Sequence, residues 1–354
     1  MTEPVTVAVD ANGADLGPAE VARGAAIAAE RGISVLLFGA AAEMKPANGV
    51  EIVDAPVSIA KIPDPARAVR STPDASIVKA VEAVASGRAD AVVSGGSTGA
   101  ALAASLFRFK RAKGVHRPAL AIVVPVPHAP FLLLDAGANV SVRPEHLVQF
   151  AHMGAAFMEV VLGVERPRVA LLSNGEEPSK GPDDVVAAHA VLSANPGGMD
   201  FVGNVEGFAI GKGVADVLVA DGFAGNVALK VMEGTSDVLL REVRAAAVSS
   251  PRSKLGGLLL RPALRGLRDQ IDPEAHGGAV LLGLRRLGVV PHGSFGARGF
   301  ANAIEVAARG VREDVLGRTH ERLAAAGALR GGEPGNGDAD GGRPSAAAAT
   351  LPDQ

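Results

Sequence analysis

Short apolar segments with almost no polar interruption alternate with longer helical segments along most of this chain, and this alternation restricts the folds available to it. Apolar runs of this kind are typical of strands in a parallel sheet that is covered on both faces. The helical segments between them would form the two covering layers. The sequence therefore predicts an α/β fold, a three-layer α/β/α Rossmann-like domain with a mostly parallel sheet. The expected strands are Val5–Val9, Val35–Phe38, Ala91–Val93, Ala119–Val124, Phe131–Leu134, Val169–Leu172 and Val217–Ala220.

Helical segments separate these strands, and two further helical segments lie outside the alternation. From Phe223 to about Ala247 a long helix has no strand partner, and the Leu-rich, basic segment Pro251–Arg268 follows it. Because Pro251 and Pro262 interrupt helical structure, we expect a short helical hairpin, an excursion from the domain over about residues 233–272. The helices expected between the strands are Pro18–Arg31, Ser76–Ser86, Thr98–Lys110 and Pro144–Leu162.

Composition and charge exclude several classes of protein. Apolar residues make up 48% of the chain, enough for a large core, so we expect one α/β domain over residues 1–330 and a disordered Gly-, Pro- and Ala-rich tail over residues 331–354. The 35 Lys and Arg against 38 Asp and Glu give a net charge of −3, which argues against a nucleic-acid-binding protein. The absence of Cys excludes disulfides, thiolate catalysis and cysteine metal sites. With neither a signal peptide at Met1–Asp10 nor an uninterrupted apolar span, we expect a cytoplasmic location.

Small and polar residues follow the expected strands at the points where ligands bind to α/β sheets. Ligands of an open parallel sheet bind beyond the carboxyl ends of its strands. We therefore expect these loops to share one rim of the sheet and to carry the chemistry. The loops are residues 10–15, 94–100, 135–139, 173–181, 201–207, 221–226 and 292–294.

The loop Ser94–Gly99 is the best candidate for a phosphate cradle. Its glycines allow backbone N–H groups to converge, Ser97 and Thr98 add hydroxyls, and the following helix offers its positive end. The alternative is an ordinary tight turn, since the loop matches neither a Walker A motif nor G-x-G-x-x-G. Lys180 follows a Gly-Glu-Glu turn and could neutralise phosphate or a developing oxyanion, or could be a solvated surface lysine.

Asp10, Asp135 and Asp221 each follow a strand directly, where a carboxylate commonly caps the next loop or helix. Capping is the favoured interpretation for Asp135. Asp10 and Asp221 could instead orient groups of the site.

Asn204, Asn226 and His292 stand beside glycines. The two amides could hold a carbonyl or phosphate oxygen or could simply tolerate left-handed backbone, and His292 could be a base or a structural hydrogen-bonding group. No cluster has metal-ligand spacing and no Gly-x-Ser-x-Gly motif is present, so we expect neither a metal site nor a serine hydrolase.

The basic Leu-rich segment resembles an element that binds a membrane surface. Between Val243 and Arg268 there are six cations and no acid, interleaved with leucines. Leucines can enter the bilayer interface while cations meet anionic headgroups. The alternatives are a helix pair at a dimer interface and a docking surface for an acidic protein. The residues expected to contact the membrane are Leu258, Leu259, Leu260, Arg261 and Arg265.

Taken together, ten sequence blocks in register resemble the acyl-[acyl carrier protein]:phosphate acyltransferase family of bacterial phospholipid synthesis. The resemblance runs from Val7 to about Gly310. Five positions differ from that family's usual pattern: Asn12 and Ala14 replace Met and Gly, Ser97 replaces Asn, and Ser71-Thr72 replaces a Lys-Lys pair. The blocks are Val7–Pro18, Ala89–Ala100, Arg117–Ala121, Leu134–Val140, Gln149–Gly154, Ala170–Gly181, Phe201–Gly207, Ala215–Lys230, Gly277–Leu284 and His292–Ile304.

This resemblance implies a reaction, a fold and a set of partners. Phosphate would attack the thioester of acyl-[acyl carrier protein] and give acyl phosphate on an isocitrate/isopropylmalate dehydrogenase-like fold, with no cofactor. The implied partners are acyl carrier protein, inorganic phosphate, a second copy of the chain, the inner face of the cell membrane and, transiently, glycerol-3-phosphate acyltransferase. The implied catalytic residues are Lys180, Asn226, Asp10 and Asn204, and the implied phosphate- or substrate-binding residues are Ser97, Thr98, Gly99, Asn12, Asp221 and His292.

Two other functions stay open on sequence alone. One is a phosphotransacetylase-like acyltransferase that uses a CoA thioester, and the other is a catalytically inert scaffold on the membrane surface. A dehydrogenase on the isopropylmalate-type scaffold is disfavoured, because the chain offers no paired Asp metal site.

Overall fold

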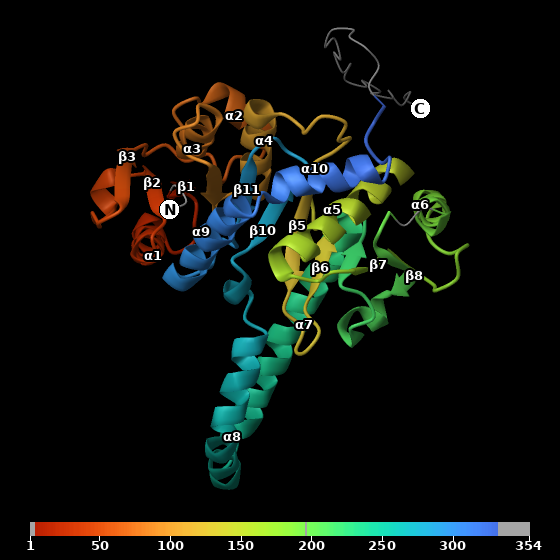
Figure 1. Cartoon of the computed structure of the whole chain (residues 1–354). Coiled ribbons are helices and arrows are strands. Elements are labelled where there is room, and N and C mark those ends of the chain that lie inside the picture. The colour runs from red at the N-terminus through yellow and green to blue at the C-terminus, as the bar shows by residue number, and fades with distance from the viewer. Residues whose placement is uncertain (1–3, 195–196, 332–354) are drawn as a thin grey trace, which may run out of the picture.

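The computed structural model describes residues 4–194 and 197–331, which build a single sheet of 11 strands between two helical layers (Figure 1). The strand order is β3-β2-β1-β4-β11-β10-β5-β6-β9-β7-β8. Seven of the ten strand pairings are parallel, which confirms the mostly parallel α/β fold. The strands are β1 Thr6–Asp10, β2 Ser34–Gly39, β3 Val50–Asp54, β4 Ala91–Ser94, β5 Ala119–Val124, β6 Phe131–Leu134, β7 Arg168–Ser173, β8 Asp200–Glu206, β9 Val217–Val219, β10 Ala279–Leu282 and β11 Leu287–Val290.

All seven predicted strands are present, each with ends within one residue of the prediction. Strands β3, β8, β10 and β11 were not among them. Strand β3 lies at the sheet edge and has no fully buried residue. Because this position tolerates a charged side chain, Glu51 interrupts the apolar run by which the other strands were predicted. Strands β10 and β11 form an antiparallel pair whose basic turn, residues 283–286, divides two very short apolar runs.

The prediction that all strand ends share one rim is wrong. Strand β10 is antiparallel to β11 and to β5, and β5 is antiparallel to β6. Consequently β6, β9, β7 and β8 run opposite to β1, β2, β3, β4 and β11. Strands buried on both faces have the same apolar pattern in either direction, so that pattern does not reveal the reversal. The six residues that join β5 to β6 do, because they are too few for a parallel crossover.

The helices form two layers, one on each face of the sheet. Helices α1, α5, α6, α9 and α10 cover one face, and α2, α3 and α4 cover the other (Figure 1). The four helices predicted between strands are confirmed, and Pro144–Leu162 has its predicted bounds. The helices are α1 Pro18–Glu30, α2 Pro65–Ser71, α3 Ser76–Ala85, α4 Thr98–Phe109, α5 Pro144–Leu162, α6 Asp183–Ala194, α7 Gly222–Val248, α8 Pro251–Gln270, α9 Ala297–Arg312 and α10 Val315–Ala325, with 3-10 turns η1 Ala41–Glu43, η2 Gly207–Lys212 and η3 Pro273–His276.

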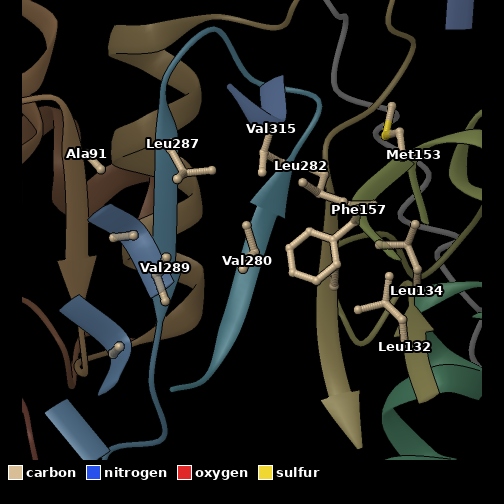
Figure 2. Close-up of a cluster of buried hydrophobic side chains, with 14 of the residues drawn as sticks. Ala91, Leu132, Leu134, Met153, Phe157, Val280, Leu282, Leu287, Val289 and Val315 are labelled. Carbon is tan, nitrogen blue, oxygen red and sulfur yellow. The ribbon is translucent and has the colours of Figure 1, made fainter. Parts of the chain in front are cut away.

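Alternating side chains of each strand supply two apolar cores. In β6, Leu132 and Leu134 point toward Met153 and Phe157 of α5, whereas Leu133 joins the core under α4. Figure 2 shows the first of these cores, where residues of β6, β10, β11 and α5 gather between the sheet and its helices. Fully burying one such side chain stabilises the fold by about 1.5–3 kcal/mol. Because many side chains are buried on both faces, the sheet is a rigid platform for the loops at its edges.

Helices α7 and α8 form a hairpin that projects from the sheet (Figure 1). Pro251 begins α8 as predicted, but the expectation that Pro262 interrupts the helix is wrong, because α8 continues through it. No side chain of α8 is buried, so the carbonyl freed by the missing N–H can bond to water. None of the helices in the described ranges combines the length and apolar character that a bilayer crossing requires. Apart from Gly331, the predicted tail 331–354 lies outside the described residues.

Candidate active site

A cavity of about 630 Å³ brings together residues from both halves of the sheet. Five strand positions separate β4 from β9, so a twist of about 20–25° per strand rotates the two halves against each other by on the order of 100°. This rotation brings loops that leave oppositely directed strands into one site. Three predicted site residues line it, Thr98, Asn226 and His292. The walls also include Ala136, Lys230 and His276.

The loop after β4 presents the start of α4 to the cavity. Ser97 is the N-cap of α4, and its Oγ accepts a hydrogen bond from the N–H of Ala100 at 3.3 Å. Thr98, the first residue of α4, is exposed and lines the cavity beside the positive end of the helix. A Cβ at Gly95 would lie 2.4 Å from Cζ of Phe300, so only glycine allows this close approach. Gly99 packs on Pro65 of α2 and therefore faces away from the cavity.

A buried carboxylate lies beneath this loop. Asp10 ends β1 at 3% exposure, and its two oxygens accept hydrogen bonds from Ser76 Oγ at 2.6 Å and Ser94 Oγ at 2.7 Å. Burial raises the pKa of Asp10 to about 6, although the serine hydroxyls lower it. Asn12 donates its side-chain N–H to the carbonyl of Ala55 at 2.8 Å. Asp10 and Asn12 thus hold the loops of the first half of the sheet rather than line the cavity.

The opposite wall is built from the loops after β6 and β9. The Asp135 carboxylate accepts hydrogen bonds from the backbone N–H groups of Leu120 and residues 137–139 and from the Asn139 amide, which confirms its predicted capping role. Asp221 caps α7 by accepting from the N–H groups of residues 223 and 224, at 2.8 and 2.9 Å. Gly225 lies against the Asp135 carbonyl, where a Cβ would approach to 2.0 Å. This contact places Asn226, whose Nδ2 donates to the Ala136 carbonyl at 3.2 Å.

Two histidines line the cavity, and the sequence predicted only one. Nδ1 of His292 lies 2.7 Å from Ser294 Oγ and accepts from the Ser294 N–H at 3.3 Å, so the neutral ring carries its proton on Nε2. His276 is half-buried at the end of η3, and burial lowers its pKa. His276 follows the hairpin, in a segment for which the sequence predicted no strand or helix. The neighbouring block Gly277–Leu284, which resembles the acyltransferase family, was the one feature that could have indicated a site residue here.

Lys180, on the loop after β7, and Asn204, in the neighbouring strand β8, form a second group. Nδ2 of Asn204 donates to the carbonyls of Glu177 at 2.8 Å and Lys180 at 3.4 Å. Asn204 is buried, and its Oδ1 has no hydrogen-bond partner among the described residues. The Lys180 side chain is exposed. The structure therefore joins these two predicted residues to each other, while the cavity lining that includes Thr98 and Asn226 does not include them.

A second cavity of about 780 Å³ adjoins the first. The residues that line both cavities are Ile122, Val123, Leu229, Glu233, Asp237 and Pro273. The second cavity extends along the base of the hairpin, where Met232 and Leu240 line it together with charged side chains such as Arg268 and Arg298. Aliphatic side chains therefore line the whole cleft, whereas the Thr98 hydroxyl, the Asn226 amide and the two imidazoles belong to the first cavity.

One group of side chains has the spacing of a metal site, but its hydrogen bonds disfavour a cation. Ligand atoms of His116, Glu145 and His146 lie within 4.8 Å of one another. Nδ1 of His146 accepts the N–H of Arg143 at 3.2 Å, so the neutral ring carries its proton on Nε2 and neither nitrogen is left free for a cation. Burial lowers the pKa of both histidines; surrounding arginines lower it further, whereas Glu145 raises it.

Sequence comparison identifies close relatives over nearly the whole chain. A family model described as fatty acid synthesis protein matches residues 5–318. The phosphate acyltransferase of Heliobacterium modesticaldum is 42% identical over 327 residues, which are 90% of this chain and 97% of that protein. The phosphate acyltransferase of Desulforudis audaxviator is 45% identical over 316 residues, 88% of this chain and 94% of that protein.

Solved structures share the fold at much lower sequence identity. A phosphotransacetylase from Streptococcus pyogenes superposes with a TM-score of 0.58 at 17% identity, covering 88% of this chain and 95% of that one. The EutD phosphotransacetylase from Staphylococcus aureus gives a TM-score of 0.55 at 19% identity, covering 87% and 94%. At these identities the likeness concerns the fold alone.

Proposed function

The chain belongs to the fatty acid synthesis protein family, together with the bacterial phosphate acyltransferases that it matches, and on this premise we propose that it transfers a fatty acyl group from acyl-[acyl carrier protein] to inorganic phosphate. A phosphate oxygen attacks the thioester carbonyl, a C–O bond forms, and the C–S bond breaks. The carrier protein leaves as a thiolate that takes up a proton, and acyl phosphate is the other product. Phosphate is already an anionic nucleophile near neutral pH, so capture, placement and oxyanion stabilisation are the tasks left to the protein.

The observation that supports this proposal most is that the cavity holding Thr98, Asn226 and His292 continues into a second cavity along the base of the hairpin. The hydroxyl, amide and imidazole groups of the first cavity suit phosphate and the reacting carbonyl. The aliphatic side chains of Leu229, Met232 and Leu240 along the continuation suit a long acyl chain. Volumes of about 630 and 780 Å³ lie in the range of about 300–1,000 Å³ that ligand cavities typically occupy.

Specific roles follow from the position of each side chain. Thr98 and the N-terminus of α4 hold phosphate through a hydroxyl and backbone N–H groups. The Asn226 amide and the Nε2–H of His292 donate to the developing oxyanion or to phosphate. Asp10 and Asp221 act through the loops that they hold, and are positioning residues.

Lys180 on the loop after β7 and Asn204 in the neighbouring β8 are assigned to an initial capture of phosphate, outside the cavity in which Thr98 holds it for reaction. Lys180 offers an exposed cation there, and the unpartnered Asn204 Oδ1 is an acceptor for an N–H or a protonated phosphate oxygen. The test is Lys180→Ala, with KM for phosphate as the readout. An unchanged KM would remove Lys180 from the site.

The hairpin is assigned to the inner face of the cell membrane and to a second copy of the chain. Leu258, Leu259 and Leu260 are 62%, 75% and 59% exposed, and the cations Arg261 and Arg265 follow them. This combination suits an interfacial helix, and the exposed valines of α7 suit a homodimer contact. Membrane binding would bring acyl phosphate close to a membrane-bound glycerol-3-phosphate acyltransferase. Replacing the three leucines by Ser should abolish co-sedimentation with anionic vesicles, and unchanged co-sedimentation would refute the assignment.

The proposed donor is tested by comparing thioesters of one acyl chain on carrier protein and on CoA. Phosphate-dependent thiol release is followed with a thiol reagent, to which the enzyme contributes nothing because it has no Cys. We expect a higher kcat/KM for the carrier-protein substrate. A higher value for acyl-CoA would favour the phosphotransacetylase-like alternative. No release with either, but retained vesicle binding, would favour the scaffold.

A further inference from the structure

Seven exposed cations gather at the end of the molecule opposite the α7–α8 hairpin. They lie on the α4–β5 loop, on the β10–β11 turn and at the end of the described chain, whereas α8 lies at the other extreme (Figure 1). We call them the basic surface. Its members are Lys110, Arg111, Lys113, Arg117, Arg285, Arg286 and Arg330.

Backbone hydrogen bonds hold these three segments together. The N–H of Arg285 donates to the carbonyl of Lys110 at 3.2 Å, and its Nε donates to the carbonyl of Arg111 at 3.1 Å. The N–H of Arg330 donates to the carbonyl of Gly114 at 2.8 Å. The basic surface is therefore a fixed arrangement rather than a set of independent lysines and arginines.

No carboxylate neutralises the basic surface. Among residues 4–194 and 197–331, none of its seven cations has a carboxylate oxygen within 4 Å, whereas the neighbouring Arg108 and Arg143 are paired with Glu82 and Glu145. The whole chain nevertheless carries a net charge of −3. A concentrated positive field on a slightly acidic protein steers an acidic partner to one place.

The basic surface suits an acidic protein rather than a bilayer. Large exposed apolar side chains are absent from residues 110–117 and 283–286, in contrast to the exposed leucines of α8. Insertion into lipid needs such side chains, whereas electrostatic docking of a protein does not.

The basic surface also lies within reach of the cavity. Helix α4 runs from Thr98, in the cavity wall, to Phe109, and its 12 residues span about 18 Å. Leu120, another lining residue, follows Arg117 by three residues of extended chain. A phosphopantetheine arm is as long as about five extended residues, or about 17 Å, and so matches this distance.

We propose that the basic surface docks the acyl carrier protein, which is an acidic protein, and that its phosphopantetheine arm runs along α4 to the cavity. This inference rests on the proposed function. The proposed docking site is therefore separate from the cations of the hairpin, which would face anionic headgroups of the membrane. The enzyme could then accept its acyl donor from the cytoplasmic side while the hairpin stays on the membrane.

The test compares two charge reversals of equal size on two substrates. Lys113→Glu/Arg286→Glu changes the basic surface, and Arg252→Glu/Lys254→Glu makes the same change on α8. Each full-length variant is assayed with decanoyl-[acyl carrier protein] and with decanoyl-pantetheine, which carries the arm without the protein. We expect the first variant to raise KM for the carrier-protein substrate at least about tenfold, with kcat unchanged, and to leave both constants for decanoyl-pantetheine unaltered. The α8 variant should leave all four constants unchanged.

Three results would overturn the proposal. They are an unchanged KM in the first variant, a raised KM in the α8 variant alone, or an equal loss on both substrates in the first variant. Failure of the proposed function would look different, since the unaltered enzyme would then release no thiol from decanoyl-[acyl carrier protein] in the presence of phosphate.

Discussion

Asp10→Asn should stabilise the protein at high pH, and the gain should vanish in acid. In the folded protein the pKa of Asp10 rises from 3.8 to about 6 because the carboxyl is buried. At 1.36 kcal/mol per pKa unit, folding disfavours the ionised carboxylate by about 3 kcal/mol. The folded state binds the proton more tightly than the unfolded chain does. Stability therefore falls as pH rises from about 4 to 6, and the full cost is present above about pH 6.

Asparagine removes the ionisation but also weakens the hydrogen bonds from Ser76 and Ser94 by about 1–2 kcal/mol. We therefore expect Asp10→Asn to raise the free energy of unfolding by about 1–2 kcal/mol at pH 8. The change with pH isolates the ionisation, because asparagine does not titrate and the difference between the two proteins varies with pH only through Asp10. Between pH 4.5 and pH 8 the effect of the substitution should differ by about 2 kcal/mol.

Urea unfolding of both proteins at the two pH values measures this difference. Asp269→Asn, which makes the same substitution at an exposed carboxyl on α8, is the matched control. An Asp10→Asn effect that is the same at pH 4.5 and pH 8 would refute the account of a buried, ionisable carboxyl beneath the glycine loop. A fall in turnover despite the gain in stability would fit a positioning role for Asp10.

Three further substitutions test other parts of the site. Gly225→Ala places a Cβ 2.0 Å from the Asp135 carbonyl oxygen and should lower the free energy of unfolding, measured by urea denaturation, by about 1–3 kcal/mol. An unchanged midpoint of the urea transition would mean that the two loops separate readily. Asn226→Ala should lower kcat about 10²-fold in the thiol-release assay, as expected when a donor to an oxyanion is removed, and full activity would exclude this role. Leu240→Trp narrows the second cavity and should reduce kcat/KM for palmitoyl substrates more than for butyryl ones, whereas equal losses would place the acyl chain elsewhere.

Periodicity predicted the elements well because each depends on its own local sequence. Helix α5 has its predicted bounds, and the long α7 begins one residue before the prediction. The strand pattern of β6 does not give its direction, since a strand buried on both faces has no pattern that distinguishes parallel from antiparallel pairing. The length of the connection was the available signal. Residues 125–130 are too few for the crossover that a parallel pair requires, so β5 and β6 pair antiparallel.

The sequence predicted several residues of the candidate site, but it did not predict which of them lie together. Thr98, Asn226 and His292 were chosen as residues that follow strands, and the structure brings them to one cavity. Lys180 was chosen on the same grounds but lies on a loop outside that cavity lining. His276 was missed because it joins the site through the sharp return of the chain from the hairpin.

Formation of acyl phosphate is the most direct test of the central claim. Purified full-length protein, palmitoyl-[acyl carrier protein] and inorganic phosphate would be followed together by ³¹P NMR and by thiol release. We predict an acyl phosphate resonance that grows in equal amount with the free thiol, and a rate that saturates with phosphate. Thiol release accompanied by free fatty acid at a rate independent of phosphate would contradict the claim and would mean that water is the nucleophile in the cleft.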